Sequence, residues 1–170
     1  SHISCNGASD GIITVTASGG TVSLSYLLVE MPGNVTGAAN GIFTGVPAGT
    51  YTVLVTDVNS CTETTLPVTL VNPPVITATA DVTSDYNGSQ LSCFGASDGR
   101  LTVTASGGTG TLSYVLNEIP ANVSGLITGI FTNLPAGTYT VTVTDKNGCS
   151  EVTAPVTITP PVVLSVNASV

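Results

Sequence analysis

The stretch GIITVTAS, residues 11–18, alternates apolar and polar side chains and returns 88 residues later as GRLTVTAS, residues 99–106. Strict alternation is typical of a β-strand with one buried face. The second copy carries Arg100 in place of Ile12, which marks the even-numbered face as the exposed one. The inward residues of the first copy are therefore predicted to be Ile13, Val15 and Ala17.

The whole chain of 170 residues repeats with this offset. Sliding residues 1–82 onto residues 89–170 leaves no gap, and about 50 of 82 pairs are identical. A duplication on this scale predicts two domains of one architecture in tandem.

The Pro-Pro pair at residues 73–74 marks the predicted seam, because proline ends strands and stiffens linkers. We therefore expect a first repeat over residues 1–74 and a second over residues 75–170. Residues 75–81 could close the first repeat or open the second. The same question applies to residues 163–170, which could be the strand that leads into a next repeat.

The composition is typical of an all-β protein. Only 7% of the residues are charged, 42% are hydrophobic, the net charge is −8, and Lys146 and Arg100 are the only basic side chains. Such a surface cannot neutralise a run of phosphates, so we expect no nucleic-acid partner. No apolar run is long enough to span a bilayer and no leader opens the chain, so we expect no membrane insertion and an internal fragment.

Each repeat is predicted to contain six or seven short strands, separated by turns rich in Gly, Pro, Asn and Asp. The economical arrangement is two antiparallel sheets packed face to face. We therefore predict two tandem immunoglobulin-like β-sandwiches in an elongated arrangement. Tyr51 and Tyr139 occupy the place of a tyrosine corner, in which the hydroxyl bonds back to the preceding turn; a plain core tyrosine is the alternative.

The four cysteines occupy equivalent places in the two repeats. Two bridges within the repeats, Cys5–Cys61 and Cys93–Cys149, would preserve the symmetry. A bridge Cys61–Cys93 would instead leave the other two cysteines unpaired. We predict the bridges within the repeats, which need an oxidising compartment.

Catalysis and metal binding find few candidate residues. His2 is the only histidine and lies at the terminus, and the acidic side chains are sparse, so we predict no enzyme activity. Asp10 and Asp98 fit a turn cap better than a calcium site. Asp81, Asp85 and Asn87 offer oxygen ligands near the seam, so calcium there is a weaker alternative to a polar linker, and no other cofactor is expected.

The two repeats differ most in one loop, where Ala38 and Ala39 become Leu126 and Ile127. Two apolar residues at a loop tip could form a contact patch or could fold under the loop.

The order of motifs resembles the SprB-type repeat of Bacteroidota cell-surface gliding adhesins. These motifs are SCNGASDG, then VTASGGT, then VPAGTYTVLVTDVNSC, then a Thr-rich strand before Asn-Pro-Pro. One departure is Ser60, where the second copy has Gly148, a turn position that should tolerate serine. The resemblance implies a long, repetitive surface protein that is exported by type IX secretion, is moved by the gliding motor and grips the substratum. It implies no catalytic residues.

We therefore expect structural stalk or spacer modules on the outside of a bacterial cell, with neighbouring repeats of the same chain and a surface polysaccharide as candidate partners. The alternative is a carbohydrate-binding module of a secreted protein. The composition speaks against this alternative, because the chain has no Trp, three Phe and five Tyr, and sugar-binding faces usually present exposed aromatic rings.

Overall fold

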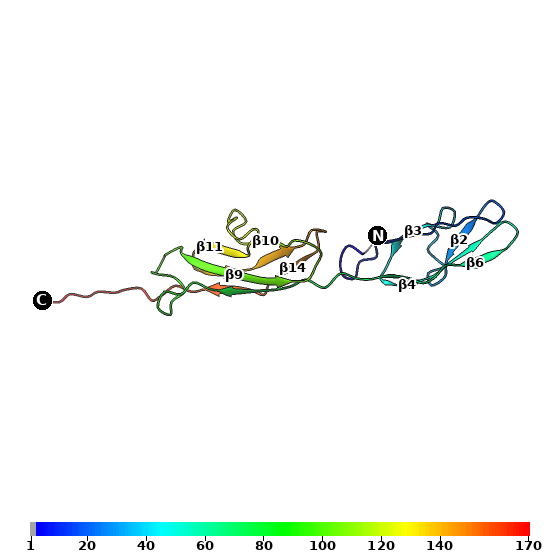
Figure 1. Ribbon diagram of the computed structural model, residues 1–170. Helices are drawn as coiled ribbons and strands as arrows, with labels where there is room; N and C mark the ends of the chain where they lie inside the picture. The colour runs from blue at the N-terminus through cyan, green and yellow to red at the C-terminus, as the bar shows by residue number, and fades with distance from the viewer. Residues whose placement is uncertain (1–2) are drawn as a thin grey trace. The chain divides into compact units, whose positions relative to one another are not determined.

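The computed structural model describes residues 3–170, and over this range it contains strands and turns and no helix. The chain folds as two compact units, with the boundary between Pro74 and Val75. Each unit consists of small antiparallel sheets, so the predicted all-β sandwich class is confirmed (Figure 1).

The first unit contains seven strands in the described range, which form sheets of order β1-β3, β2-β5-β6 and β4-β7. Its strands are β1 (Gly11–Thr14), β2 (Ser25–Leu28), β3 (Ile42–Val46), β4 (Gly49–Tyr51), β5 (Val53–Thr56), β6 (Thr62–Thr64) and β7 (Val68–Leu70).

The second unit repeats this pattern and has one more strand, β8, so its sheets have the order β11-β9-β8, β10-β13-β14 and β12-β15. Its strands are β8 (Thr77–Val82), β9 (Gly99–Ser106), β10 (Ser113–Leu116), β11 (Ile130–Leu134), β12 (Gly137–Tyr139), β13 (Val141–Thr144), β14 (Ser150–Val152) and β15 (Val156–Ile158).

One continuous segment of each unit crosses from one sheet to the other. In the first unit, β4 pairs with β7 and β5 pairs with β2 and β6, and Thr52 lies between them. The carboxylate of Glu30 accepts hydrogen bonds from the Thr52 amide and hydroxyl, both at 2.8 Å. Glu118 holds Thr140 in the same way in the second unit. These exposed glutamates therefore fix the crossing point of the chain.

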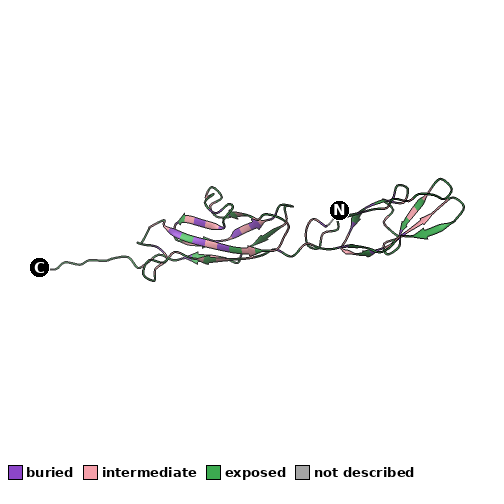
Figure 2. Ribbon diagram, viewed as in Figure 1, coloured by how far each residue is buried: buried purple, intermediate pink, exposed green. Residues whose placement is uncertain are grey.

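Each unit has a core of buried side chains (Figure 2). Of the residues predicted to face inward in the first copy, Ile13 belongs to the core, whereas Val15 and Ala17 are only partly buried. In β1, Ile13 is buried, whereas Ile12 and Thr14 are exposed. The clusters contain equivalent residues in the two units, with three additional members in the second. The first consists of Ile3, Ile13, Leu28, Phe43, Val46, Tyr51, Val53 and Leu70. The second consists of Ile76, Leu91, Leu101, Val103, Leu116, Phe131, Leu134, Tyr139, Val141, Val143 and Ile158.

The tyrosine corner is confirmed in both units. The Tyr51 hydroxyl donates to the Pro47 carbonyl at 3.0 Å, and the Tyr139 hydroxyl donates to the Pro135 carbonyl at 2.8 Å. Both rings are buried, so each hydroxyl needs this partner, which ties a late strand to the turn before it.

The two units differ most along one strand. β9 is eight residues long, whereas the equivalent β1 is four residues long, although the peptide VTAS is identical at residues 15–18 and 103–106. In β9 this peptide pairs with β8, in a register from Thr77 opposite Ser106 to Val82 opposite Leu101. Because pairing with a neighbour defines a strand, the same peptide is a strand only where β8 lies beside it.

Candidate functional site: an open groove in the first unit

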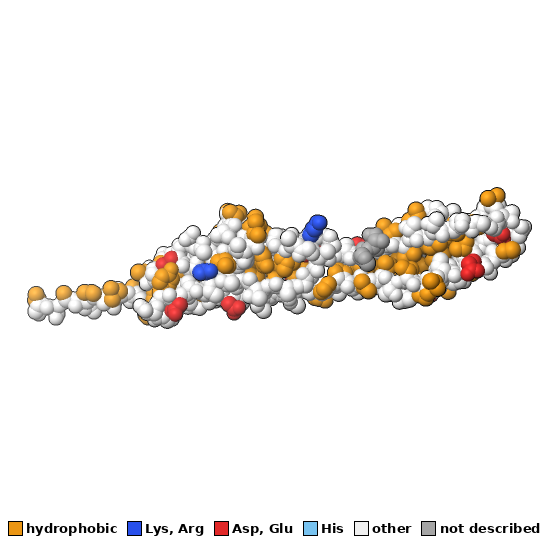
Figure 3. Space-filling view, viewed as in Figure 1, with side chains coloured by type: hydrophobic (Ala, Val, Ile, Leu, Met, Phe, Trp, Pro, Cys, Tyr) orange, Lys and Arg blue, Asp and Glu red, His pale blue; other side chains and the backbone are white. Residues whose placement is uncertain are grey.

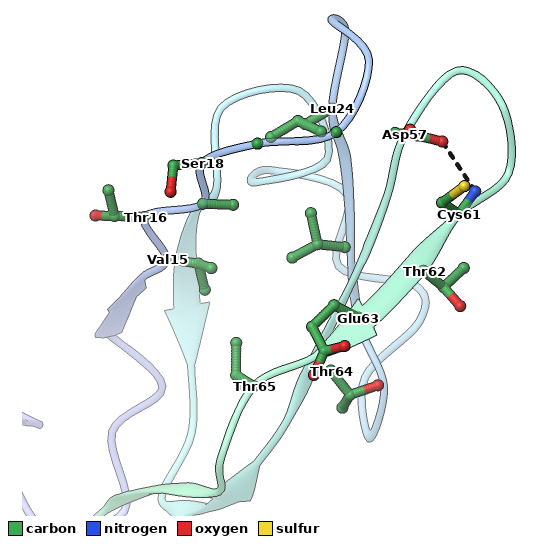
Figure 4. A pocket seen from close by; sticks show the side chains of 14 residues that line it. Val15, Thr16, Ser18, Leu24, Asp57, Cys61, Thr62, Glu63, Thr64 and Thr65 are labelled. Atoms are coloured by element: carbon green, nitrogen blue, oxygen red, sulfur yellow. Dashed lines mark hydrogen bonds between the residues drawn. The ribbon is translucent and has the colours of Figure 1, made fainter.

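The first unit has a groove along the segment that follows β1 (Figure 4). Two hollows of about 370 Å³ and 470 Å³ share Val15, Thr16 and Thr65 in their linings. One wall is formed by residues 12–20, and the other by β5, β6 and the segment that leads into β7. The lining is mainly threonine and aliphatic, which suits an extended apolar peptide better than a charged ligand.

The residues that line the groove are less buried than their counterparts in the second unit. Four of the groove residues are only partly buried, whereas their counterparts in the second unit are fully buried. These pairs are Val15 with Val103, Val55 with Val143, Asp57 with Asp145, and Thr65 with Thr153. In the second unit β8 contacts β9, β14 and β15, and Ile76 just before it joins the core at 7% exposure. The groove of the first unit therefore corresponds to the place that β8 and Ile76 fill in the second.

Gly107 lies at the end of the space that β8 fills in the second unit. At Gly107, a Cβ atom would lie 1.9 Å from the Val75 carbonyl oxygen, so only glycine allows the backbone to approach. The equivalent Gly19 has the same φ of 88° and nothing within 4 Å of the Cβ position. The first unit thus has the same loop shape and open space where the second unit has a chain.

A carboxylate organises the hairpin at the end of the groove. Asp57 accepts hydrogen bonds from the backbone amides of Asn59, Cys61 and Thr21 at 2.9, 2.8 and 3.0 Å. The amide bonds from Thr21 and Cys61 lower the pKa of Asp57. Asp145 makes the equivalent contacts, and although its burial raises its pKa, the amides of Thr109, Cys149 and Asn147 lower it overall.

These contacts define what the groove can do chemically. A carboxyl group that acts as a general acid at neutral pH needs a raised pKa, and the shift of Asp57 has the opposite sign. Among residues 3–170, no group of three or more His, Cys, Asp or Glu side chains could hold a metal ion. His2 lies outside the described residues. Asp57 is therefore a carboxylate that holds the hairpin beside the groove.

The prediction of disulfides within the repeats is wrong for this structure. Cys61 and Cys93 are free and exposed, whereas Cys5 and Cys149 are disulfide-bonded. Neither the Cys5–Cys61 nor the Cys93–Cys149 bridge is formed. The alternative bridge Cys61–Cys93 is not formed either.

The physical reason is that the two cysteines of one repeat lie at opposite ends of the unit. The opening peptide of the first repeat, SCNGASDG at residues 4–11, packs on the segment after β7, where Asn6 Nδ2 donates to the Pro73 carbonyl at 2.9 Å. Cys61 lies instead at the tip of the β5–β6 hairpin. The path along β4 and β5 spans roughly 23 Å at 3.3 Å per residue. A disulfide needs Cα atoms within about 7 Å, so this pair is too far apart.

The opening turn of each repeat has the predicted aspartate cap. Asp10 Oδ1 accepts from the Ser4 amide at 3.0 Å, and Asp98 Oδ1 accepts from the Ser92 amide at 3.2 Å. Hydrogen bonds from these serines lower the pKa of both carboxyl groups. The aspartates therefore act as the turn caps that the sequence suggested.

The calcium candidates lie in different local structures. Asp81 is on β8 opposite Thr102, whereas Asp85 Oδ1 accepts from the Gly88 amide at 2.7 Å within a turn. Asn87 occupies that turn with a positive φ of 54°. The turn explains Asp85 and Asn87, and calcium at these residues stays a prediction.

The loop that differs between the repeats is exposed in the second unit. Leu126 is 41% exposed and Ile127 is 81% exposed, so they do not fold under the loop. A contact role for these two residues stays a prediction.

The groove is the feature that sequence reasoning missed. Its signal lies in two segments, residues 75–82 and 163–170, which alternate apolar and polar residues in the same phase.

Within the described residues, no helix is long and apolar enough to cross a membrane.

Comparison with known proteins supports the family resemblance. The SprB repeat model matches residues 1–29 and residues 86–121, one region in each copy of the duplicated sequence. No curated protein matches the chain.

Two solved structures give weak similarities. One is a C-terminal 282-residue fragment of intimin in complex with the intimin-binding domain of its translocated receptor, with 17% identity and a TM-score of 0.32. That match covers 73% of this chain and 45% of the fragment, so the chain spans less than half of the intimin structure. The other is the amphioxus IgVJ-C2 molecule, with 13% identity, a TM-score of 0.35 and coverage of 92% and 99%. The fold class depends on the sheets described above, and two segments of the chain, one in each β-sandwich unit, match the SprB repeat model.

Proposed function

We propose that the two units are structural repeat modules of a bacterial cell-surface adhesin, in which they act as spacers of a stalk involved in surface attachment and gliding. The observation that carries this proposal is the presence of a SprB repeat match in both copies of one duplicated sandwich. A spacer needs stable modules that follow one another in series, and a tandem duplication supplies them. The acidic composition keeps neighbouring copies soluble.

The test replaces the coding region for both units with an unrelated pair of β-sandwich domains of equal length in the native bacterium. A spacer role predicts that attachment and gliding persist after this replacement and weaken after a plain deletion. If replacement abolishes attachment as completely as deletion, with equal surface display, the units themselves grip the target and the spacer role is wrong.

A carbohydrate-binding module is the second candidate, because one observation favours it. Phe94 is 62% exposed and Tyr86 is 40% exposed, and both lie near the opening turn of the second unit. Exposed rings of this kind are typical of sugar-binding faces. Binding on a glycan array that is lost in the Phe94→Ala variant would support this candidate. An array without binding would leave the spacer role as the better account.

A further inference from the structure

We propose that the groove of the first unit binds residues 163–170 of a second copy of the chain as an added β-strand, and that in a longer array each groove takes the segment that leads into its repeat. The second unit is the template for this inference. There β8 pairs with β9 and Ile76 before it joins the core, and the groove of the first unit is the equivalent place without such a strand.

The C-terminal segment has the side-chain pattern that the groove requires. In and before β8, the residues that pack on the core are Ile76, Ala78, Ala80 and Val82. The equivalent residues in the C-terminal segment, 88 positions later, are Leu164, Val166, Ala168 and Val170. The intervening positions are polar in both segments: Thr77, Thr79 and Asp81 in β8, and Ser165, Asn167 and Ser169 in the C-terminal segment.

The apolar side chains of this segment have no cover in the structure. Leu164 is 90% exposed and Val166 is 84% exposed, and residues 162–170 are exposed throughout. Figure 3 shows hydrophobic side chains spaced along this segment and gathered in a band on the first unit. An alternating apolar strand and an open sheet edge are the two halves of a strand-addition interface.

The β8–β9 pairing sets the register of the proposed interface. Transferred by the repeat offset, it places Ser165 opposite Ser18, Asn167 opposite Thr16, and Val170 opposite Ile13. The chain just before the added strand then passes Gly19, as Val75 passes Gly107. The interface is therefore antiparallel and continues the β1-β3 sheet by one strand.

The free cysteines give independent support for contacts between repeats. Each has a counterpart in the other unit that is disulfide-bonded: Cys149 for Cys61, and Cys5 for Cys93. Cys61 lines the groove. Cys93 belongs to the opening peptide of the second unit, SCFGASDG at residues 92–99. Just before this peptide, Gln90 Oε1 accepts from the Thr159 amide at 2.6 Å, near the start of the C-terminal segment.

Docking of the C-terminal segment therefore brings Cys93 of one copy to the Cys61 end of the other. The two thiols form one disulfide by exchange with a small-molecule disulfide such as oxidised glutathione. The Cys93 thiolate first attacks the reagent, which forms a mixed disulfide on Cys93 and releases one small-molecule thiol. The Cys61 thiolate then attacks the Cys93 sulfur and releases the second small-molecule thiol. The two released thiols carry the two electrons and two protons.

Sedimentation velocity of the 170-residue chain over a range of concentrations tests the interface. Because residues 163–170 lie outside both cores, substitutions there leave the units folded. The Val166→Asp/Ala168→Asp variant places two carboxylates toward the groove, and the matched Ser165→Asp/Asn167→Asp variant places the same charge on the outer face. We expect concentration-dependent association of the wild type, at least a tenfold loss in the first variant, and a change within about threefold in the control. A wild type that stays monomeric at millimolar concentration, or equal losses in the two variants, would overturn the proposal.

Oxidation of the associated chain with a glutathione redox buffer tests the direction of the contact. Glu-C protease cleaves after Glu30, Glu63, Glu118 and Glu151, so the four cysteines fall in four separate peptides. The proposal predicts a disulfide between peptides 31–63 and 64–118 that is lost in the Cys61→Ser variant. The head-to-tail contact would be contradicted by disulfides that join two copies of the same peptide. It would also be contradicted if associated material contained no disulfide between peptides 31–63 and 64–118. The proposed spacer function survives either of these negative results.

Discussion

Ile76 tests whether the segment after Pro74 belongs to the second unit. This side chain is 7% exposed and packs in the second core, and its Cγ1 lies 3.0 Å from the Cβ position of Gly108. Ile76→Ala removes three carbon groups, which are worth about 2.4 kcal/mol at about 0.8 kcal/mol each, and the cavity raises the cost to about 3 kcal/mol. The equivalent Leu164→Ala removes the same number of groups from an exposed site, so we expect a change below about 0.5 kcal/mol.

Guanidinium unfolding followed by circular dichroism provides the measurement. With a slope of about 3 kcal/mol per molar, Ile76→Ala should lower the midpoint of one transition by about 1 M and leave the other transition unchanged. Leu164→Ala at low protein concentration should move neither. An unchanged midpoint in Ile76→Ala, or equal shifts in the two variants, would show that the assignment of this segment to the second core is wrong.

Three further predictions concern the turns and the cysteines. Tyr139→Phe removes the hydrogen bond to Pro135 and should lower the free energy of unfolding of the second unit by about 1 kcal/mol, measured by denaturant unfolding; no change would mean that the corner contributes nothing. The lowered pKa values of Asp57 and Asp145 stabilise the folded state above the ordinary value of 3.8, and this contribution is lost as the pH falls through the lowered values, so melting temperatures should fall steeply below about pH 4. The Asp57→Asn/Asp145→Asn variant should have a lower melting temperature at pH 7 and a shallower decrease of the melting temperature with falling pH. An unchanged decrease would contradict the stabilising role of these two carboxylates in their turns. Alkylation of the folded chain followed by Glu-C digestion should label peptides 31–63 and 64–118 and spare peptides 1–30 and 119–151. Protection of all four peptides from alkylation would instead support disulfides within the repeats.

Local features of the fold could be predicted from the sequence because the duplication provides an internal comparison. The change from Ile12 to Arg100 identified the wet face of β1, and the structure buries Ile13 as expected. The tyrosine corner and the aspartate caps also follow from local spacing. Each of these features is determined by residues a few positions apart.

The cysteine partners and the groove could not be predicted in this way, because both depend on contacts between distant segments. Symmetry favoured a bridge from Cys5 to Cys61, but the length of β4 and β5 places them at opposite ends of the unit. The peptide VTAS is the same in both repeats, and only the presence of β8 makes it a strand in one of them. An identical peptide sequence does not show in which repeat a neighbouring strand pairs with that peptide.

Amide hydrogen exchange at Thr16 and Thr104 tests the central claim most directly. The Val103 amide donates to Gly129 on the β11 side, and neighbouring amides of a strand point to opposite sides, so the Thr104 amide faces β8. In a dilute monomer, we predict that Thr104 exchanges at least a hundredfold more slowly than Thr16, and that Thr16 becomes protected when the chain associates. Equal protection of the two amides in the dilute monomer, or a Thr16 amide that stays unprotected in the associated state, would contradict the account.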